Sequence, residues 1–284
     1  MKIRKFENKN YKGIFVKGQT LRIAINSKYP ILELDYPEFY DISITDKCFG
    51  NCEYCYQDSL PVKKNYENIL EKVNAFFGSM SENEKPFQVA IGGGEPTLHP
   101  DFINLLKLFK ELDILPNYTT NGMWIDSDDK KSIIKATKKY CGGVAVSTHK
   151  HLKHYWENAA NALYNANIFV NLHIIISDKQ SVDEFVEIYN DWNGKIKYFV
   201  LLPYTASGRA SNKNVDTDYL FSKLPQNAKD IAFGANFYNV LRKHNYPVYL
   251  YEPEMFSKYL SLKDNGYLYS SSFSDKIIKN NFLL

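Results

Sequence analysis

Three of the four cysteines in this chain, Cys48, Cys52 and Cys55, follow the spacing Cys-x3-Cys-x2-Cys. A loop this short keeps all three thiolates pointing into one pocket, where they can bind three corners of a cube-shaped [4Fe-4S] cluster. The fourth iron then has no protein ligand. An open coordination position is typical of a catalytic metal site, whereas a structural site closes its shell. The spacing therefore predicts a reactive iron-sulfur centre.

Two simpler uses of these cysteines stay open at this point. A structural zinc site needs a fourth ligand, but Cys141 lies far downstream and no histidine falls within thirty residues of the three cysteines. Buried or disulfide-bonded thiols are the other alternative. Three cysteines cannot pair among themselves, and a chain of this size does not need disulfides to build a core. Both alternatives fit the sequence less well than a cluster.

A glycine-rich segment, Gly92-Gly93-Gly94-Glu95-Pro96, comes after a predicted strand over residues 87–91. Glycines at this position let the backbone approach a ligand without interference from a Cβ atom. An ordinary tight turn between a strand and a helix has the same composition. The segment gains meaning from its position downstream of the cysteines, since a motif is interpreted by its context.

The cysteine spacing followed by this segment resembles the radical S-adenosylmethionine (SAM) superfamily. The resemblance implies that SAM binds the open iron through its amino and carboxylate groups. The reduced cluster would then cleave SAM to methionine and a 5'-deoxyadenosyl radical, which abstracts hydrogen from a substrate. It also implies a reduced flavodoxin or ferredoxin as electron donor.

The resemblance assigns a set of residues to the SAM site. The glycine motif would bind the methionine amino group, an aromatic residue before the third cysteine would contact adenine, and a serine would hydrogen-bond the ribose. A packing tyrosine and a simple turn at Thr120-Asn121-Gly122 are the alternative interpretations. The residues assigned in this way are Tyr54, Gly93, Gly94, Glu95, Asn121 and Ser147.

Three further residues are candidates for catalysis. His173 is polar within an otherwise apolar predicted strand, so it either faces the site or is a core histidine. Tyr204 and Arg209 follow the last predicted strand of the core. An arginine there can hold a substrate carboxylate or phosphate through two parallel hydrogen bonds, or it can pin a loop.

These residues need a scaffold, and strands alternate with helices along the chain. The predicted strands cover residues 39–45, 87–91, 115–119, 143–146, 169–176 and 197–202, and the intervening helices cover 65–78, 101–112, 127–139, 151–167 and 182–192. Such alternation predicts parallel βαβ units in an α/β fold. The motifs fall at strand ends, which meet at the carboxyl edge of a parallel barrel. The resemblance gives this fold its name, a partial (β/α)6 TIM-like barrel.

We expect three parts in the chain, the core barrel carrying the chemistry. They are an N-terminal β-hairpin extension (1–38), the radical SAM core (39–210) and a C-terminal helix and strand extension (211–284). In the last part we expect a sixth helix within residues 228–244 and a strand over residues 248–251. A hairpin is predicted around Asp264-Asn265-Gly266. Peptide-modifying relatives carry cysteines for additional clusters in this region, but here serines occupy 270–272. No second cluster is expected.

Composition limits the remaining possibilities. With 44% hydrophobic residues and no signal-peptide or transmembrane pattern, we expect a cytoplasmic protein without a membrane partner. The net charge is +3, although residues 1–28 hold eight Lys/Arg against one acid. A solvated hairpin explains that stretch better than a polyanion-binding patch does, so nucleic acid is an unlikely partner.

The substrate is the least constrained part of the interpretation. The resemblance favours a peptide, while a nucleotide or another small metabolite stays open. A non-catalytic iron-sulfur redox sensor is the alternative from a different functional class. A sensor would hold a cluster and yet fail to turn SAM over.

Overall fold

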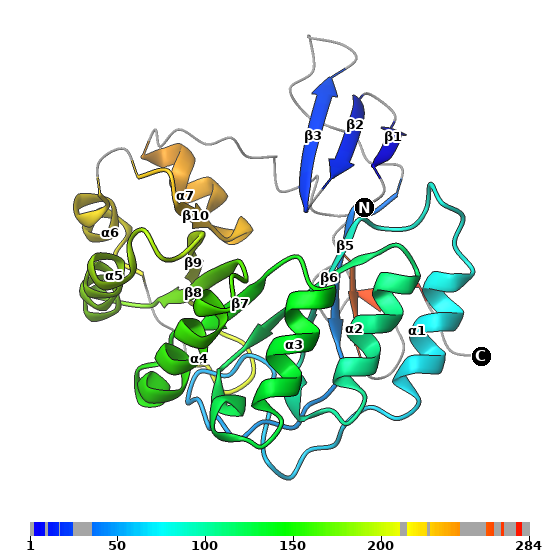
Figure 1. The fold of residues 1–284 in the computed structure, drawn as a ribbon. Coiled ribbons are helices and arrows are strands. Elements are labelled where there is room, and N and C mark those ends of the chain that lie inside the picture. Colours follow the sequence, from blue (N-terminus) through cyan, green and yellow to red (C-terminus); the bar gives the residue numbers. More distant parts are fainter. Residues whose placement is uncertain are drawn as a thin grey trace.

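The computed structural model describes residues 3–8, 11–16, 18–24, 36–210, 215–225, 228–244, 260–263, 268–269 and 277–279. Its centre is a ten-stranded sheet with the order β10-β9-β8-β7-β6-β5-β4-β11-β12-β13, in which β4 to β10 run parallel (Figure 1). These seven strands are β4 (Phe39–Ser43), β5 (Gln88–Gly92), β6 (Leu115–Thr120), β7 (Val144–Ser147), β8 (Val170–Ile176), β9 (Tyr198–Pro203) and β10 (Ile231–Phe233). The sheet curls into a half-barrel, so the expected α/β partial barrel is confirmed.

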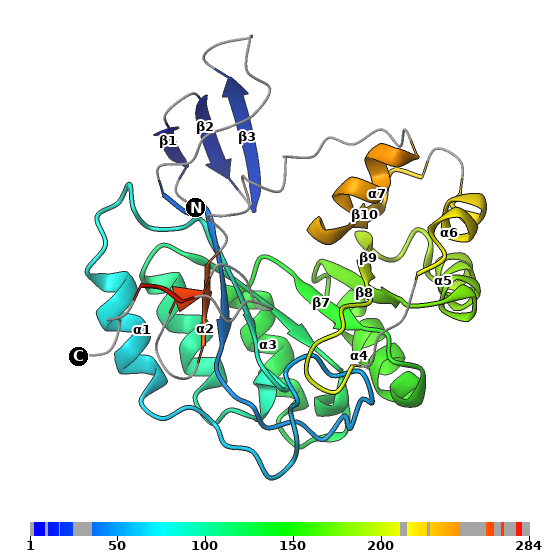
Figure 2. The same cartoon turned by 180° about the vertical axis from the view of Figure 1, so that it is seen from behind.

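Helices follow the strands and cover the outer face of the sheet (Figures 1 and 2). Five of them connect strands: α1 (Ile69–Gly78), α2 (Phe102–Glu111), α3 (Lys130–Tyr140), α4 (Lys153–Asn165) and α5 (Lys179–Trp192). Each carries apolar residues at helical spacing on the side that meets the sheet. Two short helices, α6 (Thr217–Lys223) and α7 (Tyr238–Lys243), flank β10.

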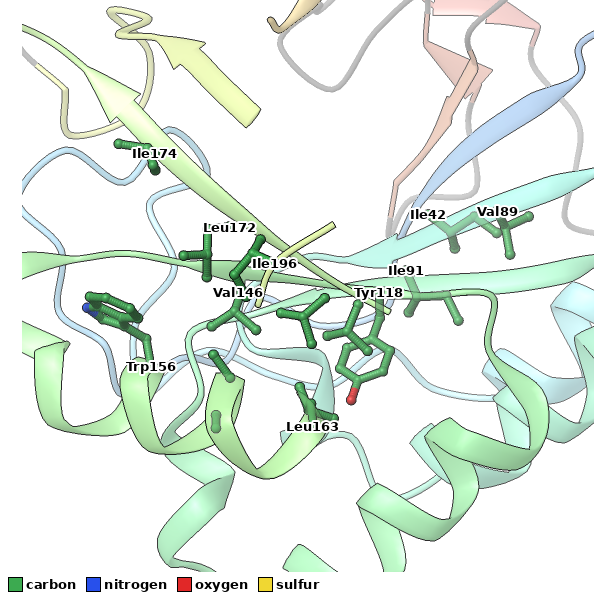
Figure 3. Packing of buried hydrophobic residues seen from close by; sticks show 14 of the residues in the cluster. Ile42, Val89, Ile91, Tyr118, Val146, Trp156, Leu163, Leu172, Ile174 and Ile196 are labelled. Carbon is green, nitrogen blue, oxygen red and sulfur yellow. The ribbon is translucent and has the colours of Figure 1, made fainter. Parts of the chain in front are cut away.

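The two faces of the strands differ in chemistry. Outward residues such as Val146 and Leu172 are fully buried against Trp156 and Leu163 of α4 (Figure 3). Burying a side chain of this size stabilises the fold by about 1.5–3 kcal/mol. Because side chains alternate along a strand, the intervening residues point inward, and many are small or polar. The outer face thus holds the barrel together and leaves the inner face available for a ligand.

The last part of the barrel contains a strand that the sequence did not predict. The helix expected within residues 228–244 is present as α7, but β10 precedes it in the same segment. β10 pairs in parallel with β9, so β4 to β10 form a run of seven parallel strands where six were predicted. β10 is only three residues long, which is too short to produce a clear alternating pattern.

The N-terminal extension is an antiparallel sheet of three strands, β1 (Arg4–Asn8), β2 (Tyr11–Val16) and β3 (Gln19–Ala24). The predicted hairpin corresponds to β2 and β3, and β1 was missed. Phe6 and Phe15 pack on Phe87, with ring centroids 4.5 and 5.0 Å away. The sheet is therefore anchored at the amino end of β5, opposite the loop that follows β4 (Figures 1 and 2).

The C-terminal strands extend the main sheet beyond β4. They are β11 (Leu260–Leu262), β12 (Leu268–Tyr269) and β13 (Ile277–Lys279). β11 runs parallel to β4 and antiparallel to β12, so the predicted hairpin is confirmed. Its turn, the strand predicted over 248–251 and the serines at 270–272 lie outside the described residues. No helix in the described part of the chain is both long and apolar enough to span a bilayer.

Candidate functional site

The three cysteines lie on the segment between β4 and α1, which we call the cluster loop (residues 44–68). The loop folds back on itself through backbone hydrogen bonds. Cys48 N donates to Leu60 O at 3.2 Å, and Leu60 N donates to Asp46 O at 3.3 Å. This pairing holds the cysteines over the carboxyl ends of the strands.

A cavity of about 350 Å³ opens beneath the loop, a size typical of small-molecule sites at ~300–1,000 Å³. It brings together residues from the cluster loop and from the ends of β5, β6, β7 and β8. The predicted site residues that line it are Cys48, Cys52, Tyr54, Cys55, Gly93, Gly94, Glu95, Asn121, Ser147 and His173. Tyr204 lies next to this set, with its ring centroid 6.4 Å from that of Tyr54.

Two of the cysteine sulfurs accept hydrogen bonds from N–H groups. Gly50 N and Asn121 Nδ2 donate to Cys48 Sγ at 3.3 and 3.5 Å, and Ser59 N donates to Cys55 Sγ at 3.4 Å. Hydrogen bonds to the ligating sulfurs are a feature by which proteins tune iron-sulfur clusters. The arrangement therefore suits thiolates that carry a cluster.

Burial raises the pKa of Cys48 to about 11 and the pKa of Cys52 to about 12. Buried thiolates are costly unless a cation compensates their charge, and coordination to a metal deprotonates a thiol outright. In the described part of the chain, no group of three or more His, Cys, Asp or Glu side chains is placed to hold a metal ion. Three cysteines that line one cavity are the donors that three corners of a [4Fe-4S] cluster require.

The glycine motif packs against the cluster loop. Gly94 N donates to Thr45 O at 2.6 Å, and Glu95 N donates to Lys47 O at 2.9 Å. A Cβ atom on Gly93 would lie 2.2 Å from Thr45 O, and one on Gly94 would lie 2.2 Å from Lys47 O. Glycine is thus required at positions 93 and 94 because the backbone of the cluster loop lies so close to them. Close approach of a ligand would be a second reason.

Glu95 joins the ends of β5 and β6. Its side chain is only 2% exposed, and it accepts hydrogen bonds from Asn121 N, Thr120 Oγ1 and Thr97 Oγ1 at 2.8, 2.8 and 2.6 Å. Burial raises the pKa of this carboxyl, an effect that its hydrogen-bond donors oppose. Glu95 therefore positions Asn121 while one side of it faces the cavity.

Arg209 contacts the cluster loop from the far side of the barrel. Its side chain makes five hydrogen bonds, to the carbonyls of Cys52 and Ser59 and to the Asp58 carboxylate. Arg209 N also donates to Cys55 O at 3.0 Å. These contacts favour the loop-pinning alternative for Arg209, and its substrate-binding role stays a prediction.

His173 projects from β8 into the cavity, so the inward orientation is the one observed. Burial lowers the pKa of His173 to about 4, which keeps its imidazole neutral at physiological pH. A neutral imidazole can accept or donate a hydrogen bond toward a ligand. A catalytic role for His173, and for Tyr204, stays a prediction.

His149 belongs to the site and was missed. Its Nδ1 lies 3.1 Å from Tyr54 Oη, and burial, together with His151, lowers the pKa of His149 to about 4. The neutral Nδ1 can therefore accept a hydrogen bond from the Tyr54 hydroxyl, which fixes the orientation of the tyrosine ring. The available signal was the position of His149 just after a strand whose end carries Ser147.

Asp41, Ser43 and Gln57 also line the cavity and were not singled out from the sequence. Asp41 and Ser43 lie two residues apart on β4 and face inward. The alternation of Phe39–Ser43 predicted a strand but could not show which of its faces meets a ligand.

Residues 42–191, more than half of the chain, match the sequence profile of the radical SAM superfamily. The chain belongs to this superfamily. A putative glycyl-radical enzyme activating enzyme of Methanocaldococcus jannaschii is 25% identical over 217 residues, which span 67% of this chain and 78% of the relative. A GTP 3',8-cyclase of Alkaliphilus metalliredigens is 24% identical, over 64% of this chain and 62% of that protein.

Solved structures of radical SAM proteins share the fold. Streptococcus suis SuiB bound to its precursor peptide SuiA superposes with a TM-score of 0.68 at 18% identity, covering 90% of this chain and 64% of SuiB. Native anSMEcpe with bound AdoMet and the Cp18Cys peptide gives a TM-score of 0.58 at 16% identity, covering 84% of this chain and 76% of that one. This chain thus spans less than two thirds of SuiB.

As in the rest of the radical SAM superfamily, the cofactors are a [4Fe-4S] cluster and SAM. The residues present fit both groups. Three cysteines line the cavity, two of them with N–H donors to their sulfurs, and the glycine motif, Asn121 and Ser147 line the space beside them. The protein's own share in such chemistry is binding, orientation and exclusion of water.

Proposed function

We propose that this radical SAM enzyme cleaves SAM reductively and abstracts a hydrogen atom from a peptide substrate. The observation that carries the proposal is the convergence of Cys48, Cys52 and Cys55 with the glycine motif on one cavity. The peptide assignment is supported by the fold shared with SuiB bound to SuiA and with peptide-bound anSMEcpe.

The chain's own residues have defined tasks in this proposal. When bound, the cluster and SAM together supply a 5'-deoxyadenosyl radical. Cys48, Cys52 and Cys55 would hold the cluster, and the N–H donors around them would stabilise the sulfur charge. Asn121, held by Glu95, and Ser147 would position SAM.

Exclusion of water is the second task, because a radical must meet only its substrate. Ala90 of β5 and Ile175 of β8 line the cavity and give its wall an apolar character. The helices outside bury the other face of the same strands. These two layers would shield a radical in the cavity from solvent on the side of the sheet.

A reduced flavodoxin or ferredoxin is the proposed electron donor. Phe49, next to the first cysteine, is 48% exposed, and Lys47 Nζ lies 5.6 Å from the centroid of its ring. An exposed aromatic residue beside a cation suits a small acidic redox partner, since complementary charge steers encounter. Binding of flavodoxin should weaken in a Lys47→Glu variant.

Deuterium transfer tests the proposed substrate class. Anaerobically reconstituted protein would be incubated with SAM, dithionite and a pool of perdeuterated peptides, or with perdeuterated nucleotides. We expect deuterium in 5'-deoxyadenosine from the peptide pool. Deuterium only from nucleotides would replace the peptide by the second candidate, which the GTP 3',8-cyclase relative favours. A cluster-bearing protein that never forms 5'-deoxyadenosine would be a redox sensor.

A further inference from the structure

We propose that His151 is a positioning residue that raises the reduction potential of the iron-sulfur cluster, because its ring places an N–H group against the sulfur of Cys52. The inference rests on the proposed function in one respect, namely that Cys52 holds the cluster. The cysteine and glycine motifs of the superfamily do not include this histidine. Its role concerns the electron that starts the reaction, whichever substrate follows.

His151 reaches the cluster loop from the loop that follows β7. It lies in a short 3₁₀ helix, Lys150–Leu152, just beyond the carboxyl end of that strand. Its Nε2 lies 2.7 Å from Gly50 O and 3.7 Å from Cys52 Sγ. The longer distance suits the larger radius of a sulfur acceptor. One ring nitrogen therefore contacts both the turn between the first two cysteines and the second cysteine itself.

The carbonyl partner decides where a proton of the ring must be. Gly50 O can only accept a hydrogen bond, so Nε2 of His151 must carry a hydrogen atom. This is true of one neutral tautomer and equally of the charged ring. The same N–H group can be shared between two acceptors, here an oxygen and a sulfur. The contact with Cys52 therefore does not depend on the charge of His151.

Neighbouring residues limit the positions open to the ring. The ring of His149 stacks on that of His151, with centroids 5.9 Å apart and 23° between the planes. His149 is itself held by Tyr54, whose hydroxyl oxygen lies 3.1 Å from His149 Nδ1. The next residue along the chain, Leu152, is buried. The N–H group of His151 is thus in place before a cluster binds.

The three cysteine sulfurs obtain their hydrogen bonds from different sources. The sulfurs of Cys48 and Cys55 accept hydrogen bonds from backbone N–H groups of the cluster loop itself. In the described part of the chain, the N–H group that lies within hydrogen-bond distance of Cys52 Sγ is that of His151. The Cys52 donor is therefore a side chain outside the loop, and one substitution can remove it while the loop sequence stays intact.

An N–H group beside a ligating sulfur stabilises negative charge. Reduction adds one electron to the cluster, so the reduced state gains more from the N–H group than the oxidised state does. His151 should therefore raise the reduction potential and ease electron transfer from the donor protein. Its ring is exposed, and solvent screening keeps the effect modest.

A redox titration of the reconstituted protein without SAM, followed by EPR, measures this effect. His151→Met removes the N–H group with little change in side-chain length. At a fixed potential we expect the ratio of reduced to oxidised cluster to fall about fivefold, equivalent to ~40 mV for a one-electron couple. His151→Gln carries an amide N–H the same number of bonds from Cα and should recover most of the loss.

His154→Gln is the matched control. His154 is exposed on α4, and its ring lies near Asn158 and Asp126. This variant should keep the wild-type potential. An unchanged potential in His151→Met, an equal shift in His154→Gln, or a shift that His151→Gln does not reduce would overturn the inference.

A second measurement applies even if His151→Met binds no cluster. Pulsed EPR of the reduced wild-type protein, labelled with nitrogen-15 histidine, should detect a weakly coupled nitrogen, because a hydrogen bond to sulfur carries spin density to its donor. The coupling should be absent in His151→Gln. No coupling in the wild-type protein, or coupling that survives in His151→Gln, would overturn the inference.

The iron content and EPR spectrum of Cys52→Ala separate this inference from the proposed function. A cluster that is unchanged in Cys52→Ala would refute the proposed site and the role of His151 with it. Loss of the cluster in Cys52→Ala, together with an unchanged potential in His151→Met, would refute the role of His151 alone.

Discussion

Two segments hold the cluster loop, and they do so by different means. The Gly93–Glu95 turn after β5 contacts its first half, through the backbone of Thr45 and Lys47. The Gly208–Arg209 segment after β9 contacts its second half, through the carbonyls of Cys52 and Ser59. The first contact depends on the absence of side-chain atoms alone. The second also has a glycine, Gly208, whose Cβ would lie 2.4 Å from Cys55 O, but it adds one charged side chain, that of Arg209.

The difference gives the two halves of the loop different tolerance to change. A backbone pressed against glycine leaves no space for even a methyl group, so any substitution there shifts the loop. The Arg209 side chain is 25% exposed and makes several separate bonds, so its loss removes them without creating a clash. We therefore expect the first half of the loop to respond in an all-or-none way to substitution of its glycine contacts, and the second half to respond by degrees to loss of the Arg209 side chain.

Among substitutions at the contacts that hold the loop, Gly94→Ala should cause the largest loss of stability and of cluster binding. Its Cβ would lie 2.2 Å from Lys47 O, so the cluster loop must move. We expect the free energy of unfolding to fall by about 3 kcal/mol and cluster incorporation to drop at least about tenfold. Urea denaturation and iron and sulfide content measure the two effects. Gly92→Ala is the control, since a Cβ there meets nothing within 4 Å, and an equal loss in both variants would contradict the packing argument.

His173 lies in the wall of the cavity, and its side chain makes no hydrogen bond to either of the two segments that hold the loop. The pH dependence of the free energy of unfolding shows whether His173 is buried in the fold. Burial lowers the pKa of His173 to about 4, so the fold disfavours the protonated ring. The unfolded chain binds that proton near pH 6.5, hence stability should be lost as pH falls from 6.5 towards 4. The loss attributable to His173 is up to about 3 kcal/mol.

Urea denaturation at several pH values measures this effect. His149 has a pKa lowered in the same direction, so His173→Phe should remove only part of the pH dependence. His154→Asn, at an exposed position, should leave the dependence intact. A wild-type stability that does not change between pH 6.5 and 4 would show that His173 is hydrated in the fold.

Arg209→Met should have the smallest effect of the three. It leaves the carbonyls of Cys52 and Ser59 without their donor, which costs about 1–2 kcal/mol after allowance for partial exposure. The cluster should still assemble in this variant. A chelator should remove it about fivefold faster than from the wild-type protein, which the decay of visible absorbance measures. Arg209→Lys should restore little, because an ammonium lacks the planar fork of donors. If Arg209→Lys lost its cluster as slowly as the wild-type protein, a positive charge alone would be enough to hold the second half of the cluster loop.

The same two segments show what the sequence could predict. The cysteines and the glycine motif were recognisable because their residue types and spacing are local. The Arg209 contacts link residues about 150 positions apart, so the sequence left the choice between loop and substrate open. The pairing of Tyr54 with His149 was missed for the same reason.

Local signals also failed where tertiary contacts decided the outcome. Asp101 stands at the N-cap of α2, where aspartate is a favoured capping residue, but its side chain makes no capping bond. β1 and β10 lie at the edges of their sheets and pair with one neighbour each, β2 and β9. The helices and strands inside the barrel were therefore predicted from their patterns, and these two edge strands were missed.

Formation of 5'-deoxyadenosine under anaerobic, reducing conditions tests the account most directly. Wild-type protein reconstituted with iron and sulfide should produce it from SAM, and Cys141→Ala should behave like wild type because Cys141 does not line the described cavity. Cys52→Ala should abolish it, since two sulfurs cannot hold the cluster in place. Production that persists in Cys52→Ala would contradict the assignment of the site.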